Sequence, residues 1–315
     1  MAVGGPPQEP AYLPVYVADA LGTFEAEGVR PRLSRAKHPT AAITALREGG
    51  AAVAVTTSDQ AIRGAWARGR PVRILVAHTE TPAVALVVAA QHGEQVTRVE
   101  DLRGRRVGIR GPGTTGHFVL GALLAARRIG SSDVEVVSFS GAALLARLGS
   151  GDLAAAVLDE PWLGRAIAGG PRILLDLRRP EDTRRHLGGS FHEVVSVASA
   201  DEKTLADLEP TLTAYARALV RVQSWLVTTP AAEVAARLPA DLVGDRERFV
   251  TRLEAVRHAY APLGEATEAG LGATFRVLQS ASPWPVGLKL APTDLREPPF
   301  LTSARARLGP TPPPP

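Results

Sequence analysis

Short apolar runs alternate with amphipathic stretches through the first two-thirds of the chain. The apolar runs are rich in valine, alanine and leucine, as at residues 72–77 and 153–158, which is typical of strands buried on both faces. The stretches between them have helical spacing of apolar residues, and several begin at serine or proline and end at glycine. This alternation predicts an α/β fold with mostly parallel sheets.

The same pattern predicts where the individual elements lie. We expect strands at residues 29–34, 51–57, 72–77, 83–90, 106–109, 134–139, 153–158, 172–177 and 193–198. We expect helices at residues 14–24, 39–47, 58–68, 118–128 and 142–148, and one from Pro161. From Asp201 onward the strand-like runs disappear, and residues 202–227, 231–238, 245–260 and 265–281 all have helical spacing.

An internal repeat of the helix–glycine–strand plan suggests two lobes. Residues 41–55 and 142–158 each contain a helix, a glycine stop and a strand. The polar groups that follow the two strands are Thr56, Thr57, Ser58 and Asp59 in the first copy and Asp159, Glu160 and Trp162 in the second. Open α/β sheets bind ligands at the carboxyl ends of their strands, so we expect two similar lobes with a ligand cleft between them.

A glycine-rich turn, Arg-Gly-Pro-Gly-Thr-Thr-Gly-His at residues 110–117, separates a predicted strand from a predicted helix. The free N–H groups and positive dipole end of such a helix start can hold an anion or a polar ligand head. No Gly-Lys-Ser/Thr follows, and no acidic ribose ligand stands at the expected distance, so neither a Walker loop nor a dinucleotide site is indicated. The other interpretation is a tight connection alone.

Composition excludes several classes of protein. The 315 residues are 45% apolar and 22% charged, which describes an ordinary globular protein. The formal charge of +4 comes from scattered arginines without interleaved aromatics, so we expect no nucleic-acid partner. The absence of cysteine excludes thiol catalysis and disulfides. Histidines 78, 117 and 192 have no metal-site spacing, so we expect neither a metal nor another cofactor.

The two ends of the sequence predict where the protein is found and which residues are disordered. Residues 1–7 have no basic or apolar leader segment, so we expect a cytoplasmic protein unless a leader lies upstream of Met1, in which case it is periplasmic or held outside the cytoplasmic membrane. The proline-rich residues 310–315 are expected to be disordered. The apolar run 83–90 is too short to cross a bilayer.

Several motifs together resemble the periplasmic substrate-binding proteins of ABC transporters, in the group that binds nitrate, sulfonates, taurine or thiamine-pyrimidine precursors. The matching segments, in order, are Leu13-Pro14-Val15-Tyr16-Val17-Ala18, Gly22-Thr23-Phe24-Glu25-Ala26-Glu27-Gly28-Val29, Ala45-Leu46-Arg47-Glu48-Gly49, Asp101-Leu102-Arg103-Gly104-Arg105-Arg106-Val107-Gly108-Ile109, the turn Gly113-Thr114-Thr115-Gly116-His117, and residues 151–161. One departure is that the family usually begins with a strand, and residues 1–10 do not predict one.

The resemblance implies a type II periplasmic-binding-protein fold of two lobes joined by two crossover strands, near residues 78–83 and 191–197. The first lobe would comprise residues 1–82 and 195–309, with a helical closing segment, and the second residues 83–194. A small-molecule ligand would be trapped by hinge closure and delivered to an ABC permease and its ATPase, and the protein would be a monomer.

Three groups of residues are the candidate ligand contacts. In the glycine turn, Gly113, Thr114 and Thr115 offer hydrogen bonds, Arg110 offers charge, and His117 stands in the first helical turn; the alternatives are a helix cap, a solvated arginine and a surface histidine. In the first lobe, the candidates are Thr56, Thr57 and Ser58 at a strand end, Tyr12 and Leu13 as a pocket wall, and His78 near a crossover. Capping alone also explains Ser58.

Glu160 is the sharpest single candidate. A carboxylate at a strand end could bind an amino or ring N–H group, with Trp162 placed to stack on it, although a helix dipole also favours an acid there. An acid beside an anion-binding turn favours a ligand with both kinds of group, such as an aminosulfonate or a pyrimidine precursor.

Three functions remain open from the sequence. The leading hypothesis is a solute-binding protein for an ABC importer. The alternatives are a biosynthetic enzyme of the thiamine-precursor type on the same fold and a cytoplasmic ligand-sensing module. No Gly-x-Ser-x-Gly elbow or His-Glu-x-x-His motif is present in the chain.

Overall fold

The computed structural model describes residues 1–66, 71–281 and 290–306, and the chain forms two compact units. Unit 1 comprises Met1–Glu80, His192–Leu271 and Gly287–Pro315, and unit 2 comprises Thr81–Phe191 and Gly272–Val286. The predicted disordered tail, residues 310–315, lies outside the described residues. Within the described part of the chain, no helix is long and apolar enough to cross a membrane.

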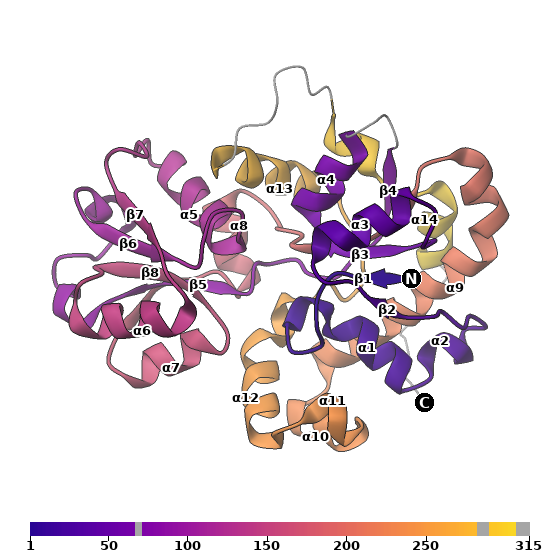
Figure 1. Cartoon of the computed structure of the whole chain (residues 1–315), viewed down its shortest axis with the longest axis horizontal. Coiled ribbons are helices and arrows are strands. Elements are labelled where there is room, and N and C mark those ends of the chain that lie inside the picture. The colour runs from indigo at the N-terminus through magenta and orange to yellow at the C-terminus, as the bar shows by residue number, and fades with distance from the viewer. Residues whose placement is uncertain (67–70, 282–289, 307–315) are drawn as a thin grey trace. The chain divides into compact units, whose positions relative to one another are not determined.

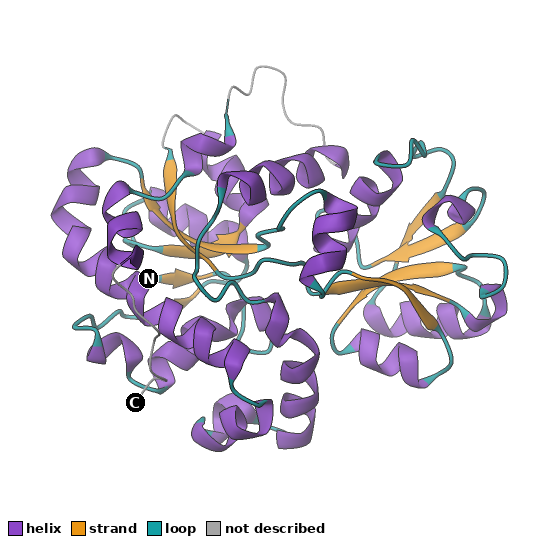
Figure 2. Cartoon of the chain, turned by 180° about the vertical axis from the view of Figure 1, so that it is seen from behind, coloured by secondary structure: helices purple, strands orange, loops and turns teal. Residues whose placement is uncertain are grey.

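Unit 1 is built on a five-stranded sheet (Figures 1 and 2). Its strands, in spatial order, are β2 (Ser34–Arg35), β1 (Ala2–Val3), β3 (Ala54–Thr57), β10 (Val194–Ser199) and β4 (Val72–Ala77). β1 pairs in parallel with both β2 and β3, whereas β10 is antiparallel to its neighbours β3 and β4. Four of the strands therefore point the same way.

Unit 2 repeats this plan with different residues. Its strands, in spatial order, are β7 (Glu135–Ser138), β6 (Arg106–Ile109), β8 (Ala155–Asp159), β5 (Val84–Val88) and β9 (Arg172–Asp176). β5 alone is antiparallel to its neighbours. In both sheets the reversed strand is the first one after the chain has crossed from the other unit. The expected fold class, two α/β lobes with mostly parallel strands, is confirmed.

Helices cover both faces of each sheet (Figure 1). The helices of unit 1 are α1 (Leu13–Ala20), α2 (Thr23–Ala26), α3 (Pro39–Arg47), α4 (Ser58–Trp66), α9 (Glu202–Thr228), α10 (Ala231–Arg237), α11 (Ala240–Val243), α12 (Arg246–Val256) and α14 (Pro299–Ala306). Those of unit 2 are α5 (Thr115–Ala125), α6 (Gly141–Ser150), α7 (Trp162–Ala168) and α8 (Pro180–Leu187), and α13 (Glu268–Ala281) begins in unit 1 and ends in unit 2.

The helical last third completes the core of unit 1. α9 buries Tyr215, Leu219 and Trp225 in a cluster that also contains residues of α1 and of the sheet. Glu27, at the end of α2, is only 8% exposed and pairs with Arg217 and Arg221 of α9. These two ion pairs link the end of α2 to α9.

Several elements differ from expectation, and for three of them the sequence gives the reason. The first residues do form a strand, β1, although it has only two residues, Ala2 and Val3; its pairing with two neighbours, not its length, stabilises it. The strand expected at 29–34 is reduced to β2, because Pro31 lacks an N–H donor and charged residues flank it. Helix α8 was not predicted, because it contains very few apolar residues.

Candidate functional site

The carboxyl ends of three strands of unit 2 carry charged residues at one edge of the sheet. β6, β8 and β9 run in the same direction, because β8 and β9 are both antiparallel to β5 and β6 is parallel to β8. Arg110 follows β6. Asp159 is the last residue of β8 and Glu160 follows it, and Asp176 is the last residue of β9, with Arg178 two residues later. Parallel strands thus bring together groups that are far apart in the sequence.

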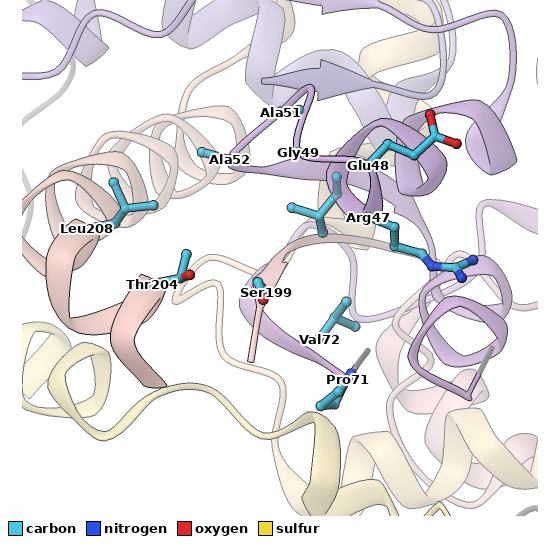
Figure 3. A pocket seen from close by; sticks show the side chains of 11 residues that line it. Arg47, Glu48, Gly49, Ala51, Ala52, Pro71, Val72, Ser199, Thr204 and Leu208 are labelled. Atoms are coloured by element: carbon cyan, nitrogen blue, oxygen red, sulfur yellow. The ribbon is translucent and has the colours of Figure 1, made fainter. Parts of the chain in front are cut away.

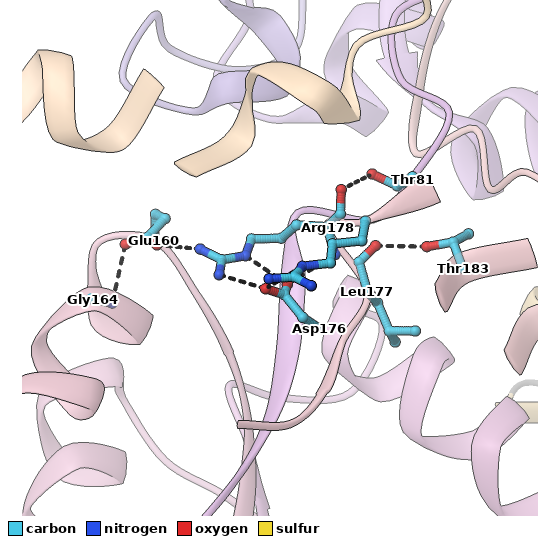
Figure 4. Close-up of polar contacts among 8 residues, drawn as sticks. Thr81, Glu160, Gly164, Asp176, Leu177, Arg178 and Thr183 are labelled. Carbon is cyan, nitrogen blue, oxygen red and sulfur yellow. Dashed lines mark hydrogen bonds and ion pairs between the residues drawn. The ribbon is translucent and has the colours of Figure 1, made fainter. Parts of the chain in front are cut away.

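Arg178 is the centre of this edge (Figure 4). Its guanidinium donates to both carboxylate oxygens of Asp176, with Nε–Oδ1 and Nη2–Oδ2 distances of 2.8 Å, and its Nη1 lies 3.1 Å from Oε1 of Glu160. The three side chains are 9–13% exposed. Hydrogen bonding to Asp176, more than the nearby charge of Glu160, raises the pKa of Arg178. A bidentate pair of this kind is strongly directional.

Glu160 therefore already has partners. Its Oε1 accepts from Arg178, and its Oε2 accepts a hydrogen bond of 3.2 Å from the backbone N–H of Gly164, in the first turn of α7. Its role in ligand binding stays a prediction, and a ligand amine at this carboxylate would compete with Arg178. Sequence reasoning missed Arg178, although the end of a predicted strand at residue 177 was the signal that could have found it.

Trp162 packs within unit 2. A Cβ placed on Gly141, the first residue of α6, would lie 2.3 Å from the indole Nε1, so the ring lies directly against the start of that helix. The guanidinium carbon of Arg165 lies 5.0 Å from the ring centre, in a cation–π contact.

The glycine turn forms a well-capped helix start. Thr114 is the N-cap of α5: its Oγ1 accepts a 3.4 Å hydrogen bond from the N–H of His117 and donates one of 2.7 Å to the carbonyl of Gly111. The N–H of Gly113 donates to Nδ1 of His117 at 3.1 Å, and its φ of +76° is one that favours glycine. Burial lowers the pKa of His117. The structure therefore shows the helix cap, and ligand binding by this turn stays a prediction.

Arg110 is half-exposed and forms an ion pair with Oδ2 of Asp159, whereas Oδ1 of Asp159 is buried and has no hydrogen-bond partner in the described part of the chain. Arg179 lies 3.7 Å from Asp176. The three carboxylates of this edge are thus matched by three guanidinium groups, and the edge is close to neutral.

In unit 1, most of the predicted contacts are buried and have internal partners. Thr56 donates a 2.9 Å hydrogen bond to the carbonyl of Pro39. Ser58 donates to the carbonyl of His192, so its hydroxyl joins α4 to the segment before β10. Leu13 is 3% exposed in the core, and Thr57, the last residue of β3, is half-buried. Their roles as ligand contacts remain predictions.

His78 belongs to a buried polar chain in unit 1. Its Nε2 lies 2.7 Å from Oγ of Ser196 in β10, and that hydroxyl lies 2.7 Å from the phenol oxygen of Tyr215 in α9. Burial lowers the pKa of His78 to about 4, against a small opposing effect of the Ala11 backbone. The neutral ring links two strands and a helix.

A separate pocket lies at the opposite edge of the unit 1 sheet (Figure 3). It has a volume of about 390 Å³ and is lined by residues at the starts of β3 and β4 and the end of β10, among them Ala52, Val72 and Ser199. The predicted contacts Thr57 and Ser58 follow the other end of β3. Among the described residues, no group of three or more potential ligands is placed to hold a metal ion.

Comparisons with known proteins support the resemblance seen in the sequence. The family model described as NMT1/THI5-like matches residues 9–231. No curated protein matches the chain. Among solved structures, a protein from Bordetella bronchiseptica RB50 is 23% identical, with 97% of this chain and 96% of that chain covered and a TM-score of 0.73.

Two other solved structures have informative names. The periplasmic sulfonate-binding protein SsuA from Methylobacillus flagellatus KT is 13% identical, with 92% and 88% of the two chains covered and a TM-score of 0.70. The periplasmic nitrate-binding protein NrtA from Synechocystis PCC 6803 is also 13% identical, with 95% and 87% covered and a TM-score of 0.63. These likenesses show a shared fold, and the predicted family group is confirmed.

The buried, neutral His78 makes stability depend on pH. Its pKa is about 4 in the folded protein and 6.5 when exposed, so the unfolded chain binds more protons between these values. Stability is therefore complete above pH 6.5 and falls as the pH drops towards 4, by about 3 kcal/mol for this group. We expect urea unfolding of His78→Gln to show a correspondingly weaker pH dependence than the wild type. Replacement of the exposed His258 by Gln is the control, and parallel pH profiles for all three proteins would contradict the assignment.

The observed cap makes Thr114 important for stability. Thr114→Ala should lower the free energy of unfolding by about 1 kcal/mol, because the N–H of His117 loses its acceptor. Thr114→Ser keeps the hydroxyl and should retain most of the stability. Chemical denaturation measures both, and an alanine variant as stable as the serine variant would show that the cap contributes nothing.

Proposed function

Since the chain belongs to the NMT1/THI5-like family, we propose that it is a solute-binding protein that captures a small polar organic ligand for an ABC importer. The observation that carries the proposal is the family match over residues 9–231. The paired units with the same strand order, and the names of two proteins that share the fold, support it. Delivery to a permease and its ATPase, outside the cytoplasm and as a monomer, is part of the proposal.

We infer that the ligand carries an acidic group, as a sulfonate or an acidic pyrimidine precursor does. Arg110 is a half-exposed charged group that directly follows β6, at the start of the glycine turn. Its pair with Asp159 is half-exposed, and exposed ion pairs contribute only about 0–1 kcal/mol. An anionic ligand can therefore bind the exposed N–H groups of this guanidinium while the pair with Asp159 stays in place. Thr115 and His117, in the first turn of α5, stand on the same strand-to-helix connection.

The remaining predicted contacts fall into two groups, those that are half-buried and those that are fully buried. The half-buried groups, Thr57, Thr115, His117 and Trp162, are proposed to touch the ligand. Leu13, Thr56, Ser58 and His78 are buried among protein partners, and we propose that they hold the strand ends in place. Gly113 and Thr114 shape the turn. The alternative, a biosynthetic enzyme, differs from a binding protein in one measurable respect, because an enzyme converts the bound molecule into a product.

A thermal-shift screen tests the proposed function. The probes are alkanesulfonates, taurine, pyrimidine phosphates, flavins and nitrate, and we expect at least one organic probe to raise the melting temperature. A ligand at 100 times its Kd adds about 2.7 kcal/mol of stability, which is readily detected. If every probe leaves the melting temperature unchanged, the binding-protein proposal is wrong.

The charge balance around Arg178 gives a second prediction. Glu160→Gln leaves Arg178 paired with Asp176 alone and gives the edge one positive charge in excess. Affinity for ethanesulfonate should rise about two- to fivefold at low salt, and the gain should vanish at 1 M salt. Glu181→Gln, the same change at an exposed position of α8, is the control. Equal affinities in the two variants would exclude the edge as the anion site.

A further inference from the structure

β2 is the edge of the unit 1 sheet that stays open to solvent. It is the outermost strand of the sheet and, among the described strands, pairs with β1 alone (Figure 1). Ser34 and Arg35, its two residues, are both exposed. At the opposite edge, β4 has the 3-10 helix Pro292–Leu295 against it, and Arg73 of β4 donates a 2.7 Å hydrogen bond to the carbonyl of Asp294. The two edges are therefore treated differently by the fold.

The outer side of β2 presents backbone hydrogen-bonding groups. On the inner side, the N–H groups of Ser34 and Ala36 donate to two carbonyl groups at β1, at 2.9 and 2.8 Å. Successive residues of a strand direct their backbone groups to opposite sides, so those of Leu33 and Arg35 point away from the sheet. A row of such groups is a template for pairing with another extended chain.

The segment around this edge carries positive charge without any acidic residue. Residues 28–47 contain five arginine or lysine residues and neither aspartate nor glutamate. Arg32, Arg35 and Lys37 are exposed, and they lie within β2 or next to it. Arg30 forms an ion pair with Glu25 from outside this segment, but both side chains are exposed, and such pairs are weak.

The positive side chains stand on both faces of the edge. The amino group of Met1 donates to the carbonyl of Arg32 at 2.9 Å, so the chain already runs beside β1 at this residue. Side chains of a strand alternate between the two faces of the sheet, so Arg32 and Arg35, an odd number of positions apart, lie on opposite faces. Leu33, on the same face as Arg35, packs against the core of unit 1. A strand that pairs with β2 therefore has a cation beside it on either face.

The backbone pattern and the charge together select the occupant. A second copy of this edge is repelled, because it brings the same charges together. A nucleic acid or a lipid surface would meet the arginines, but neither repeats N–H and C=O groups at the spacing of a strand, as a polypeptide does. Charges at an edge strand also prevent unspecific pairing, which makes the edge selective for a strand of opposite charge.

We propose that β2 is a docking site for an extended acidic segment of a partner protein. The segment adds a strand to the unit 1 sheet through the outward backbone groups of Leu33 and Arg35, and its carboxylates lie against Arg32, Arg35 and Lys37. This interaction goes beyond the proposed ligand binding and does not depend on which ligand the protein takes.

A pair of peptides tests the proposal by fluorescence anisotropy. The probe is a labelled peptide of sequence Thr-Glu-Glu-Val-Glu-Glu-Thr, and its partner has the same sequence with all internal amides N-methylated. Methylation removes the donors that strand pairing needs and leaves the charge unchanged. We expect the wild type to bind the unmodified peptide about tenfold more tightly or better, because several backbone hydrogen bonds are lost with the methylated one.

Two double variants test the charges. Arg32→Gln with Arg35→Gln should weaken the unmodified peptide about fivefold or more at low salt, since two cations beside it are removed. Arg184→Gln with Arg185→Gln is the control, because it removes the same charge from exposed positions of α8 and should leave the affinity unchanged. All four side chains are exposed, so both variants should melt close to the wild-type temperature.

Several results would overturn the proposal. Equal binding of the two peptides would show attraction by charge alone, and no binding of either would leave the cations only the role of keeping the edge unpaired. An equal loss of affinity in both double variants would show that the charge of the whole protein, not of this edge, attracts the peptide. Tighter binding of oligothymidylate or phosphatidylglycerol vesicles, dependent on Arg32 and Arg35, would assign the edge to another kind of partner.

Discussion

The rest of the structure depends on one constraint in each sheet, namely the strand that runs against its neighbours. β5 in unit 2 and β10 in unit 1 enter their sheets directly after the chain has crossed from the other unit. Because each takes the reversed direction, the other four strands of its sheet are parallel and their carboxyl ends meet at one edge. Most of the polar groups considered as ligand contacts stand at or just after these carboxyl ends.

The two edges differ in chemistry although they share a plan. In unit 2, Arg178 pairs with both Glu160 and Asp176, and Arg110 and Arg179 bring the net charge of the edge close to zero. In unit 1, the phenol oxygen of Tyr12 is buried and has no hydrogen-bond partner among the described residues.

The elements that depend on local sequence features were predicted with the correct bounds. The helix at 39–47 and the strand at 72–77 have the expected bounds, because proline in the first helical turn, glycines after the last turn and an unbroken apolar run are local features. β1 could not be predicted, because two residues show no periodicity and only their pairing partners make them a strand.

Side-chain partners were harder to predict than elements, because they depend on strand order. Serine at the start of a helix is typical of an N-cap, yet the hydroxyl of Ser58 donates to the backbone carbonyl of His192, 134 residues away. Arg178 meets Glu160 only because β8 and β9 both flank β5, an order that the sequence does not display. His78 was predicted near a crossover and lies there, but its ring forms hydrogen bonds within the core.

The central claim is that this chain binds a small organic ligand and releases it unchanged. Equilibrium dialysis against an isotope-labelled ligand identified by screening, followed by chromatography of all the label, measures both parts of the claim. The account predicts saturation at one molecule per chain, with the whole label recovered as the starting compound. A new labelled product that accumulates with time would contradict it and would identify the chain as an enzyme.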